Sequence, residues 1–277
     1  MIPAMRRRPH KGQLQYGVQR VLTNRRAVVT GASSGIGRAL AVELARHGAD
    51  LVLLARRESR LAEVAQQIAQ LGRRAICIAG DVTDATVRQR ALAATRDQLG
   101  GLDILVNNAG VAAHGRFADA NPGRVRPIME VNFFAPVEFI REAIPLLREG
   151  VQPIIVNVGS ILGRRGSPHK SEYSASKFAI HGFSEAVRPE LARLGIDVLV
   201  VAVGPTQTEH FEALLEGSPK LPWGDPPRRP ANDVARSIVR GIELGRHEIV
   251  TGWRGRTLLL LNRIAPRLVD RIMSRYG

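Results

Sequence analysis

The chain has 277 residues and is 44% hydrophobic, which is ample for a sizeable core and argues against global disorder. Its formal net charge of +15 comes mostly from arginines scattered along the sequence, a pattern that favours solvated charged faces over a dedicated nucleic-acid surface. The single cysteine, Cys77, excludes an intramolecular disulfide and a cysteine-based zinc site, and no apolar segment reaches the length that spans a bilayer.

The first predicted element is a basic extension over residues 1–24. It contains arginines and no following apolar run, so we expect neither a secretory signal nor a place for it in the folded domain. After it, short apolar runs alternate with stretches long enough for crossover helices, such as residues 36–47, 61–71 and 87–99. The predicted strands are residues 27–30, 51–55, 75–79, 103–107, 153–158, 197–203 and 248–251.

These strands are apolar throughout instead of alternating, as is typical of strands buried on both faces of a parallel sheet. The alternation of strand and helix predicts an α/β fold, a doubly wound parallel seven-stranded sheet of the Rossmann type. Neither a repeat nor a clear linker interrupts the pattern, so residues 25–252 are expected to form a single domain.

A glycine-rich stretch, "TGASSGIGRAL", follows the first predicted strand and leads into the first predicted helix. Its glycines are Gly31, Gly35 and Gly37. In this position, backbone N–H groups and the N-terminus of the helix can face a phosphate group. The stretch alone leaves two interpretations open, a phosphate cradle and an ordinary flexible turn.

The second predicted strand ends at Ala55 and is followed by Arg56 and Arg57. In a dinucleotide-binding fold this position reads the ribose, and an acidic residue here would accept a hydrogen bond from the 2′-hydroxyl of NAD. A guanidinium instead suits a 2′-phosphate, so the sequence favours NADP as the cofactor. A pair of surface arginines that only follows a strand is the alternative.

The stretch "YSASK" places Tyr173 and Lys177 four residues apart, on the same face of a predicted helix. A nearby ammonium favours the phenolate and is expected to lower the pKa of Tyr173, which would make it a plausible acid or base near neutral pH. Ser160 lies just after the predicted strand at residues 153–158, where the end of a strand would present it at the ligand edge.

Six motifs occur in order along the chain, and their combination is far more specific than any one of them. They are "TGASSGIG", the pair Asp81 and Val82, "NNAG" at 107–110, Asn132, Ser160, and Tyr173 with Lys177. Together they resemble the short-chain dehydrogenase/reductase family across roughly residues 25–252. The resemblance implies hydride transfer between a nicotinamide cofactor and a carbonyl or alcohol, and it makes the glycine stretch a phosphate cradle. Residues 160–191 look like the branch of hydroxysteroid-dehydrogenase-like enzymes and broad carbonyl reductases, which favours a hydrophobic substrate.

The resemblance also implies a role for each catalytic residue. Tyr173 would exchange a proton with the substrate oxygen, and Ser160 would hydrogen-bond that oxygen. Lys177 would lower the pKa of Tyr173 and bind the nicotinamide ribose, and Asn132 would hold a water in a proton relay. A catalytic metal is not needed, and the histidines show no metal-ligand spacing.

The cofactor contacts implied by the resemblance come from most of the predicted domain. Asp81 and Val82 would contact adenine, and the segment after Val203 would line the nicotinamide and pyrophosphate, although the family's usual Pro-Gly reads Val203-Gly204 here. The predicted cofactor-binding residues are Gly31, Ser33, Ser34, Gly35, Ile36, Gly37, Arg56, Asp81, Val82, Asn108, Ala109, Gly110, Tyr173, Lys177, Gly204, Thr206 and Thr208.

Two segments do not follow the alternation of predicted strands and helices. Residues 209–231 contain prolines that break any long helix, so we expect a loop over the carboxyl edge of the sheet that serves as a substrate lid. Residues 253–277 form a basic, amphipathic C-terminal segment. We expect it to cover the sheet edge or form a subunit contact, with peripheral attachment to an anionic membrane as the alternative.

The expected partners are a small carbonyl or alcohol substrate and further copies of the chain, as a homodimer or homotetramer, in the cytoplasm. Two other classes of function stay open. One is a catalytically silent NADP-binding regulator or scaffold, against which the intact set of Asn132, Ser160, Tyr173 and Lys177 argues. The other is a peripheral membrane or nucleic-acid binder driven by the arginine-rich surface, although nucleic acid is not the expected partner.

Overall fold

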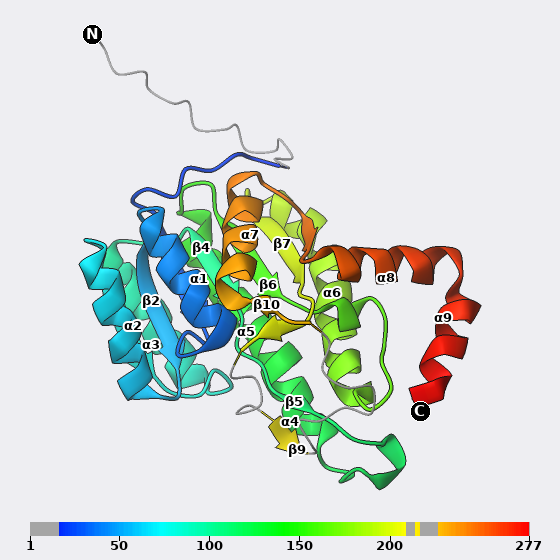
Figure 1. The fold of residues 1–277 in the computed structure, drawn as a ribbon. Coiled ribbons are helices and arrows are strands. Elements are labelled where there is room, and N and C mark those ends of the chain that lie inside the picture. Colours follow the sequence, from blue (N-terminus) through cyan, green and yellow to red (C-terminus); the bar gives the residue numbers. More distant parts are fainter. Residues whose placement is uncertain (1–16, 209–213, 217–226, 277) are drawn as a thin grey trace.

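The computed structural model describes residues 17–208, 214–216 and 227–276, and its centre is a parallel sheet of seven strands (Figure 1). The strands are β1 (Arg26–Thr30), β2 (Asp50–Ala55), β3 (Ala75–Ala79), β4 (Ile104–Asn107), β6 (Ile154–Val158), β7 (Asp197–Ala202) and β11 (Glu248–Val250). Their order across the sheet is β11-β7-β6-β4-β1-β2-β3. The chain therefore builds the sheet outward from β1 in both directions, which confirms the predicted doubly wound fold.

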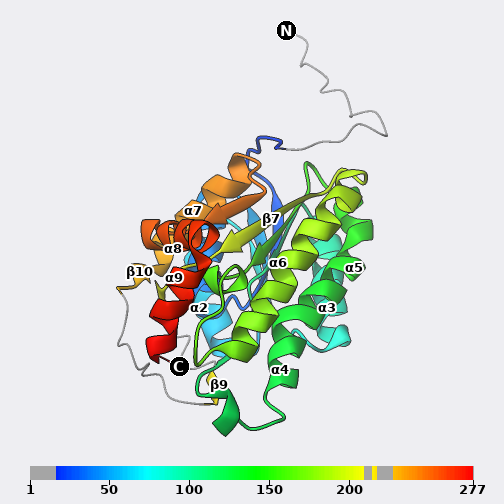
Figure 2. The ribbon, with the colours of Figure 1, turned by 90° about the vertical axis from the view of Figure 1, so that its right-hand side faces the viewer.

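Helices cover both faces of the sheet, and the core packs in two layers between them (Figures 1 and 2). One face carries α1 (Gly35–Arg46), α2 (Glu58–Gln70) and α7 (Ala231–Glu243), and the other carries α3 (Ala85–Leu99), α5 (Ala135–Arg148) and α6 (Ser171–Ala192). Successive strand residues point to opposite layers, so that Val28 joins one core cluster and Val29 the other. This two-sided burial is the reason that the strands read as continuous apolar runs.

Short elements gather beyond the carboxyl ends of the strands. The pair β5 (Ala112–Ala113) and β9 (Leu214–Glu216) and the pair β8 (Thr206–Gln207) and β10 (Arg229–Pro230) are both parallel. The helix α4 (Val125–Met129) continues through a π-helical turn into α5. Of the lid predicted at residues 209–231, the stretches 209–213 and 217–226 lie outside the described residues, while β9 and β10 lie beside β5 and β8 at this edge.

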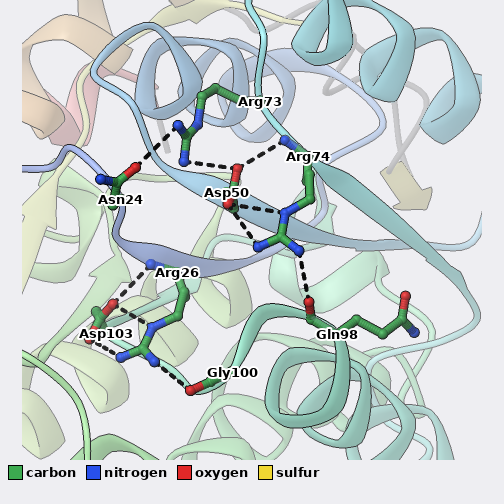
Figure 3. A network of polar contacts seen from close by, with 8 residues as sticks. All are labelled: Asn24, Arg26, Asp50, Arg73, Arg74, Gln98, Gly100 and Asp103. Atoms are coloured by element: carbon green, nitrogen blue, oxygen red, sulfur yellow. Dashed lines mark hydrogen bonds and ion pairs between the residues drawn. The ribbon is translucent and has the colours of Figure 1, made fainter.

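At the opposite edge, where the strands begin, arginines pair with buried or half-buried carboxylates (Figure 3). Arg26, the first residue of β1, binds Asp103 with Nη2 2.7 Å from Oδ1 and adds hydrogen bonds from its backbone N and Nε. Asp50, the first residue of β2, pairs with Arg73 at 3.0 Å and with Arg74 at 3.1 Å. Part of the chain's positive charge is thus paired with carboxylates of the domain itself.

The two ends of the described chain behave differently. Near the N-terminus, Arg20 and Leu22 are buried, and Arg20 pairs with Asp197, so the folded part begins before the residue 25 that the sequence suggested. Residues 1–16 of the predicted extension lie outside the described part. At the other end, α8 (Trp253–Ile264) stands away from the body and α9 (Pro266–Met273) turns off its tip (Figure 1). Among the described helices, none is both long and apolar enough to cross a membrane.

Candidate active site

The glycine-rich turn after β1 is shaped by contacts that only glycine permits. Gly31 has a φ of +64°, and a Cβ there would lie 2.8 Å from Nδ2 of Asn108. A Cβ on Gly37 would collide with the carbonyl oxygen of Gly31. The helix α1 begins at Gly35, and its N-cap residue Ser34 makes no side-chain capping hydrogen bond, so the first N–H groups of the helix suit an anion. The turn therefore fits the pyrophosphate of a dinucleotide.

A cavity of about 890 Å³ lies along the carboxyl ends of the strands and takes its walls from the glycine turn, the loops after β2 to β7, and the C-terminal helices. All but two of the predicted site residues line it. They are Gly31, Ser33, Ser34, Gly35, Ile36, Arg56, Asp81, Val82, Asn108, Ala109, Gly110, Ser160, Tyr173, Lys177, Gly204, Thr206 and Thr208. The exceptions are Gly37, which packs α1 against the turn, and Asn132, which is buried behind the wall.

The part of the cavity beside the tip of β2 is basic. Arg56 is exposed and Arg57 is half-buried, and both line the cavity. Nη2 of Arg57 donates to Oγ of Ser34 at 2.7 Å and lies 3.3 Å from Oγ of Ser33. These contacts connect the tip of β2 to the glycine turn. Two guanidinium groups and two hydroxyls at this point form a donor set that suits a phosphate on a ribose.

Ser160, Tyr173 and Lys177 meet in the same cavity. Ser160 is the N-cap of the 3-10 helix Ile161–Gly163, and its Oγ accepts a hydrogen bond from the backbone N of Leu162 at 3.1 Å. The Tyr173 hydroxyl is hydrogen-bonded to Ser160. One turn along α6, Lys177 donates from Nζ to the carbonyl of Val158 at 3.0 Å, and Nζ lies 5.7 Å from the centre of the Tyr173 ring. The arrangement offers two hydroxyl groups to a single oxygen atom of a ligand.

The pKa of Tyr173 corrects one expectation from the sequence. Burial raises the pKa of Tyr173 to about 12, although its hydrogen bond with Ser160 acts in the opposite direction. Burial also lowers the pKa of Lys177 to about 8. The expected lowering of the Tyr173 pKa is therefore wrong for this arrangement, because desolvation of the phenolate outweighs the effect of the hydrogen bond with Ser160. Tyr173 holds its proton at physiological pH and can act as a donor.

Asn132 connects two parts of the site without facing the cavity. It lies in the π-helical turn Glu130–Phe134, a local irregularity that is common at functional sites. Its Oδ1 accepts from the N of Val111, and its Nδ2 donates to the carbonyl of Val111 and to Oγ of Ser176, all at 2.9 Å. Because Ser176 precedes Lys177, Asn132 fixes the loop after β4 to this part of α6. Its part in a water relay stays a prediction.

Three charged residues, which we call the Arg124 latch, connect β9 to the start of α6. Arg124 is buried and binds both carboxylate oxygens of Glu172, at 2.8 and 3.0 Å. Its Nη1 also lies 3.2 Å from Oε1 of Glu216, whose carbonyl accepts a hydrogen bond from the N of His114. Glu172 directly precedes Tyr173, so the latch fixes part of the predicted lid to the first turn of α6. No local pattern predicts this latch, because its members are far apart in the chain.

A histidine that the sequence analysis did not assign supports the Ser160 loop from the interior. His181 is 1% exposed, and a Cβ on Gly159 or Gly163 would collide with its ring. Burial, together with the charges of Arg164 and Lys177, lowers the pKa of His181 to about 3. The ring is therefore neutral, and its bulk explains why glycines stand on both sides of the Ser160 loop.

Further cavity residues come from segments that the sequence analysis left outside the site. The apolar ones are Ile161, Leu162, Leu258, Ile272 and Met273, and the polar ones are His114, Arg165, Ser167, Lys170 and Arg228. Leu258, Ile272 and Met273 belong to α8 and α9. No sequence signal could have found them, because only the tertiary path of the C-terminal segment brings them to the cavity.

Known proteins resemble this chain in sequence. The family model for short chain dehydrogenases matches residues 25–218. Ketoacyl reductase HetN of Nostoc sp. is 31% identical over 263 residues, which cover 92% of this chain and 90% of that protein.

Solved structures share the fold. A short chain dehydrogenase from Burkholderia cenocepacia J2315 in complex with NADP is 31% identical with a TM-score of 0.73, covering 83% of this chain and 97% of that one. A short chain dehydrogenase/reductase from Burkholderia phymatum in complex with NAD has a TM-score of 0.81 at 24% identity, covering 90% and 96% of the two chains, and this likeness concerns the fold alone.

Proposed function

The chain belongs to the short-chain dehydrogenase/reductase family, and we propose that it transfers a hydride between NADP(H) and the carbonyl or secondary alcohol of a hydrophobic small molecule. One observation carries the proposal. The glycine turn that fits a pyrophosphate and the group of Ser160, Tyr173 and Lys177 line the same cavity. A cofactor held at the glycine turn would have its reactive ring within the space that Ser160, Tyr173 and Lys177 surround.

The choice of NADP is supported by the basic tip of β2. Arg56 and Arg57 stand where an NAD-binding site would have an acidic residue. Arg57 also contacts the hydroxyls of Ser33 and Ser34, which adds these two groups to the possible hydrogen-bond donors. A 31% identical relative was solved in complex with NADP. When bound, the nicotinamide supplies or accepts the hydride, while Gly31 and the first turn of α1 would hold the pyrophosphate.

The proton chemistry follows from the two hydroxyls. In the reductive direction, the carbonyl oxygen of the substrate would accept hydrogen bonds from Ser160 and Tyr173. Tyr173 is protonated because burial raises its pKa to about 12, so it can donate its proton as the carbonyl carbon receives the hydride. The Lys177 ammonium, one helical turn away, would stabilise the phenolate that remains. In the oxidative direction, Tyr173 would first have to lose its proton, and its phenolate would then take the proton of the alcohol.

A hydrophobic substrate is supported by the apolar wall that Ile161, Leu162 and Leu258 contribute to the cavity. The relative HetN is named a ketoacyl reductase, and this name refers to a keto group in an acyl compound. For the assembly, we propose a homodimer or homotetramer in the cytoplasm. The exposed rings of Phe134, in the π-helical turn before α5, and of Phe178, on α6, support such a contact.

The experiment is a screen of ketones with NADPH, followed by absorbance, and a test of Tyr173→Phe on any accepted ketone. This change keeps the ring and removes the proton donor, so the rate should fall by at least about two decades while NADPH affinity is retained. Tyr16→Phe provides the same change at another tyrosine and should leave the rate unaltered. Near-normal turnover of Tyr173→Phe, on a substrate for which chemistry limits the rate, would remove Tyr173 from this role. Tight NADPH binding with no accepted ketone would favour the silent-binder alternative.

A further inference from the structure

The C-terminal helices carry an apolar face that is exposed in the described structure. On α8, the side chains of Trp253, Leu260 and Ile264 are 71%, 58% and 73% exposed. Their spacing of seven and four residues puts them on one side of the helix. On α9, Leu268 and Ile272 are also exposed. Figure 1 shows α8 extending away from the sheet and its covering helices, and of these five apolar residues Ile272 also lines the cavity.

Positive charge surrounds this apolar face. Residues 253–277 contain six arginines and one aspartate, so this short segment supplies five of the fifteen net positive charges of the chain. Arg256 and Arg263 are exposed and follow one flank of the stripe formed by the apolar residues of α8. The aspartate, Asp270, pairs with Arg165 on the cavity wall at 2.6 Å. The outer surface of both helices therefore combines apolar side chains with a net positive charge.

We propose that α8 and α9 dock this face on an anionic lipid surface. A helix that lies in the interface buries its apolar side chains, a tryptophan among them, near the headgroups while its arginines reach lipid phosphates. A second copy of the chain suits this face less well, because a twofold contact of the face with itself would bring the same arginines together. An anionic bilayer supplies both an apolar medium and the opposite charge.

Docking of this kind would also place the cavity against the lipid. Leu258 on α8 and Met273 on α9 line the cavity, and the pair of Arg165 with Asp270 connects α9 to the loop after Ser160. The helices that contact the bilayer would thus form one wall of the substrate site. Together with the proposed function, on which this step rests, the geometry points to a carbonyl compound or alcohol that partitions into lipid.

The first test is flotation of the intact protein with vesicles of equal phosphatidylglycerol and phosphatidylcholine, and with phosphatidylcholine alone. Binding should require the anionic lipid and weaken as salt is raised. Leu260→Gln combined with Ile264→Gln should weaken binding at least about tenfold, because two exposed apolar side chains are lost. Val21→Gln with Val151→Gln, two exposed positions elsewhere, is the matched control and should change nothing. Retained NADPH affinity would show that each variant is folded.

The second test concerns the charges. Arg256→Gln with Arg263→Gln should weaken binding to the anionic vesicles roughly ten- to thirtyfold. Arg90→Gln with Arg148→Gln removes two exposed arginines from α3 and α5 and should leave binding within about twofold. In a Trp223→Phe background, Trp253 is the remaining tryptophan, and its emission should shift to shorter wavelength on anionic vesicles.

Two results would overturn the proposal. One is the absence of binding to the anionic vesicles at low salt. The other is a dimer in sedimentation that Leu260→Gln with Ile264→Gln dissociates, without vesicle binding, which would assign the face to a second copy. Neither test needs turnover, so loss of the proposed reductase activity and loss of lipid docking would be seen separately.

Discussion

At the tip of β2, Arg57 bonds with the serines of the glycine turn and Arg56 stands exposed beside it. If both donate to the 2′-phosphate of the cofactor, Arg56→Ala or Arg57→Ala should weaken NADPH binding by about one to two decades, the usual range for a charge-assisted phosphate contact. NADH affinity should change little, because that cofactor lacks the phosphate. Fluorescence titration of both cofactors measures this, with Arg90→Ala as the matched control. Equal dissociation constants for NADPH and NADH in the unaltered protein would contradict the assignment.

Lys177 sets the expected pH dependence, because burial lowers its pKa to about 8 while Tyr173 keeps its proton up to about 12. Below pH 8 the ammonium is present, and above it the neutral amine can no longer stabilise a phenolate. The kcat/KM for NADPH, which reports the free enzyme, should therefore hold up to about pH 8 and then fall by about one decade per pH unit. Lys177→Arg, if active, should move this fall to higher pH. A profile that stays flat to pH 10 would contradict the assignment.

Among the elements, β9 is held by the Arg124 latch and by its pairing with β5. Glu216→Gln keeps the shape of the side chain and removes its charge, so β9 should dock less firmly beside the substrate. The side chain of Glu216 is 33% exposed, and the lost interaction is worth about 1 kcal/mol, which corresponds to roughly a fivefold rise in KM for the ketone. Steady-state kinetics should show that rise with an unchanged NADPH dissociation constant. Glu63→Gln, on the exposed side of α2, serves as control. An equal KM for the ketone in both variants would show that the latch has no part in substrate binding.

The elements also show where sequence reasoning succeeds. Apolar runs located all seven strands of the main sheet, because burial on both faces is visible in local composition. The start of α2 was placed three residues late, since its first turn from Glu58 to Arg60 carries no apolar side chain. The pairing of β9 with β5 could not be predicted, because each strand is two or three residues long and its partner is about a hundred residues away. The site residues in motifs were predictable, whereas the latch and His181 depend on tertiary contacts alone.

For the molecule as a whole, the two edges of the sheet have separate tasks. The carboxyl edge carries the glycine turn, the cavity and Tyr173, while the opposite edge carries the ion pairs of Arg26 and Asp50 (Figure 3). This division explains part of the arginine-rich composition, which the sequence alone could only describe as scattered charge. It also means that a change at the second edge should alter stability and leave the cofactor site intact.

Asp103 provides the test of that division. It is 1% exposed, accepts hydrogen bonds from the backbone and guanidinium of Arg26, and also accepts one from the N of Val151 at 2.6 Å. Asp103→Asn removes the charge from this pair, and because the Arg26 side chain is 19% exposed, we expect a loss of about 2–3 kcal/mol in the free energy of unfolding. Urea denaturation measures it, and Asp97→Asn, an exposed aspartate paired with its neighbour Arg96, should be near neutral. NADPH affinity of folded Asp103→Asn should stay within about twofold of the unaltered protein. A loss of NADPH affinity in proportion to the loss of stability would show that the two edges are coupled.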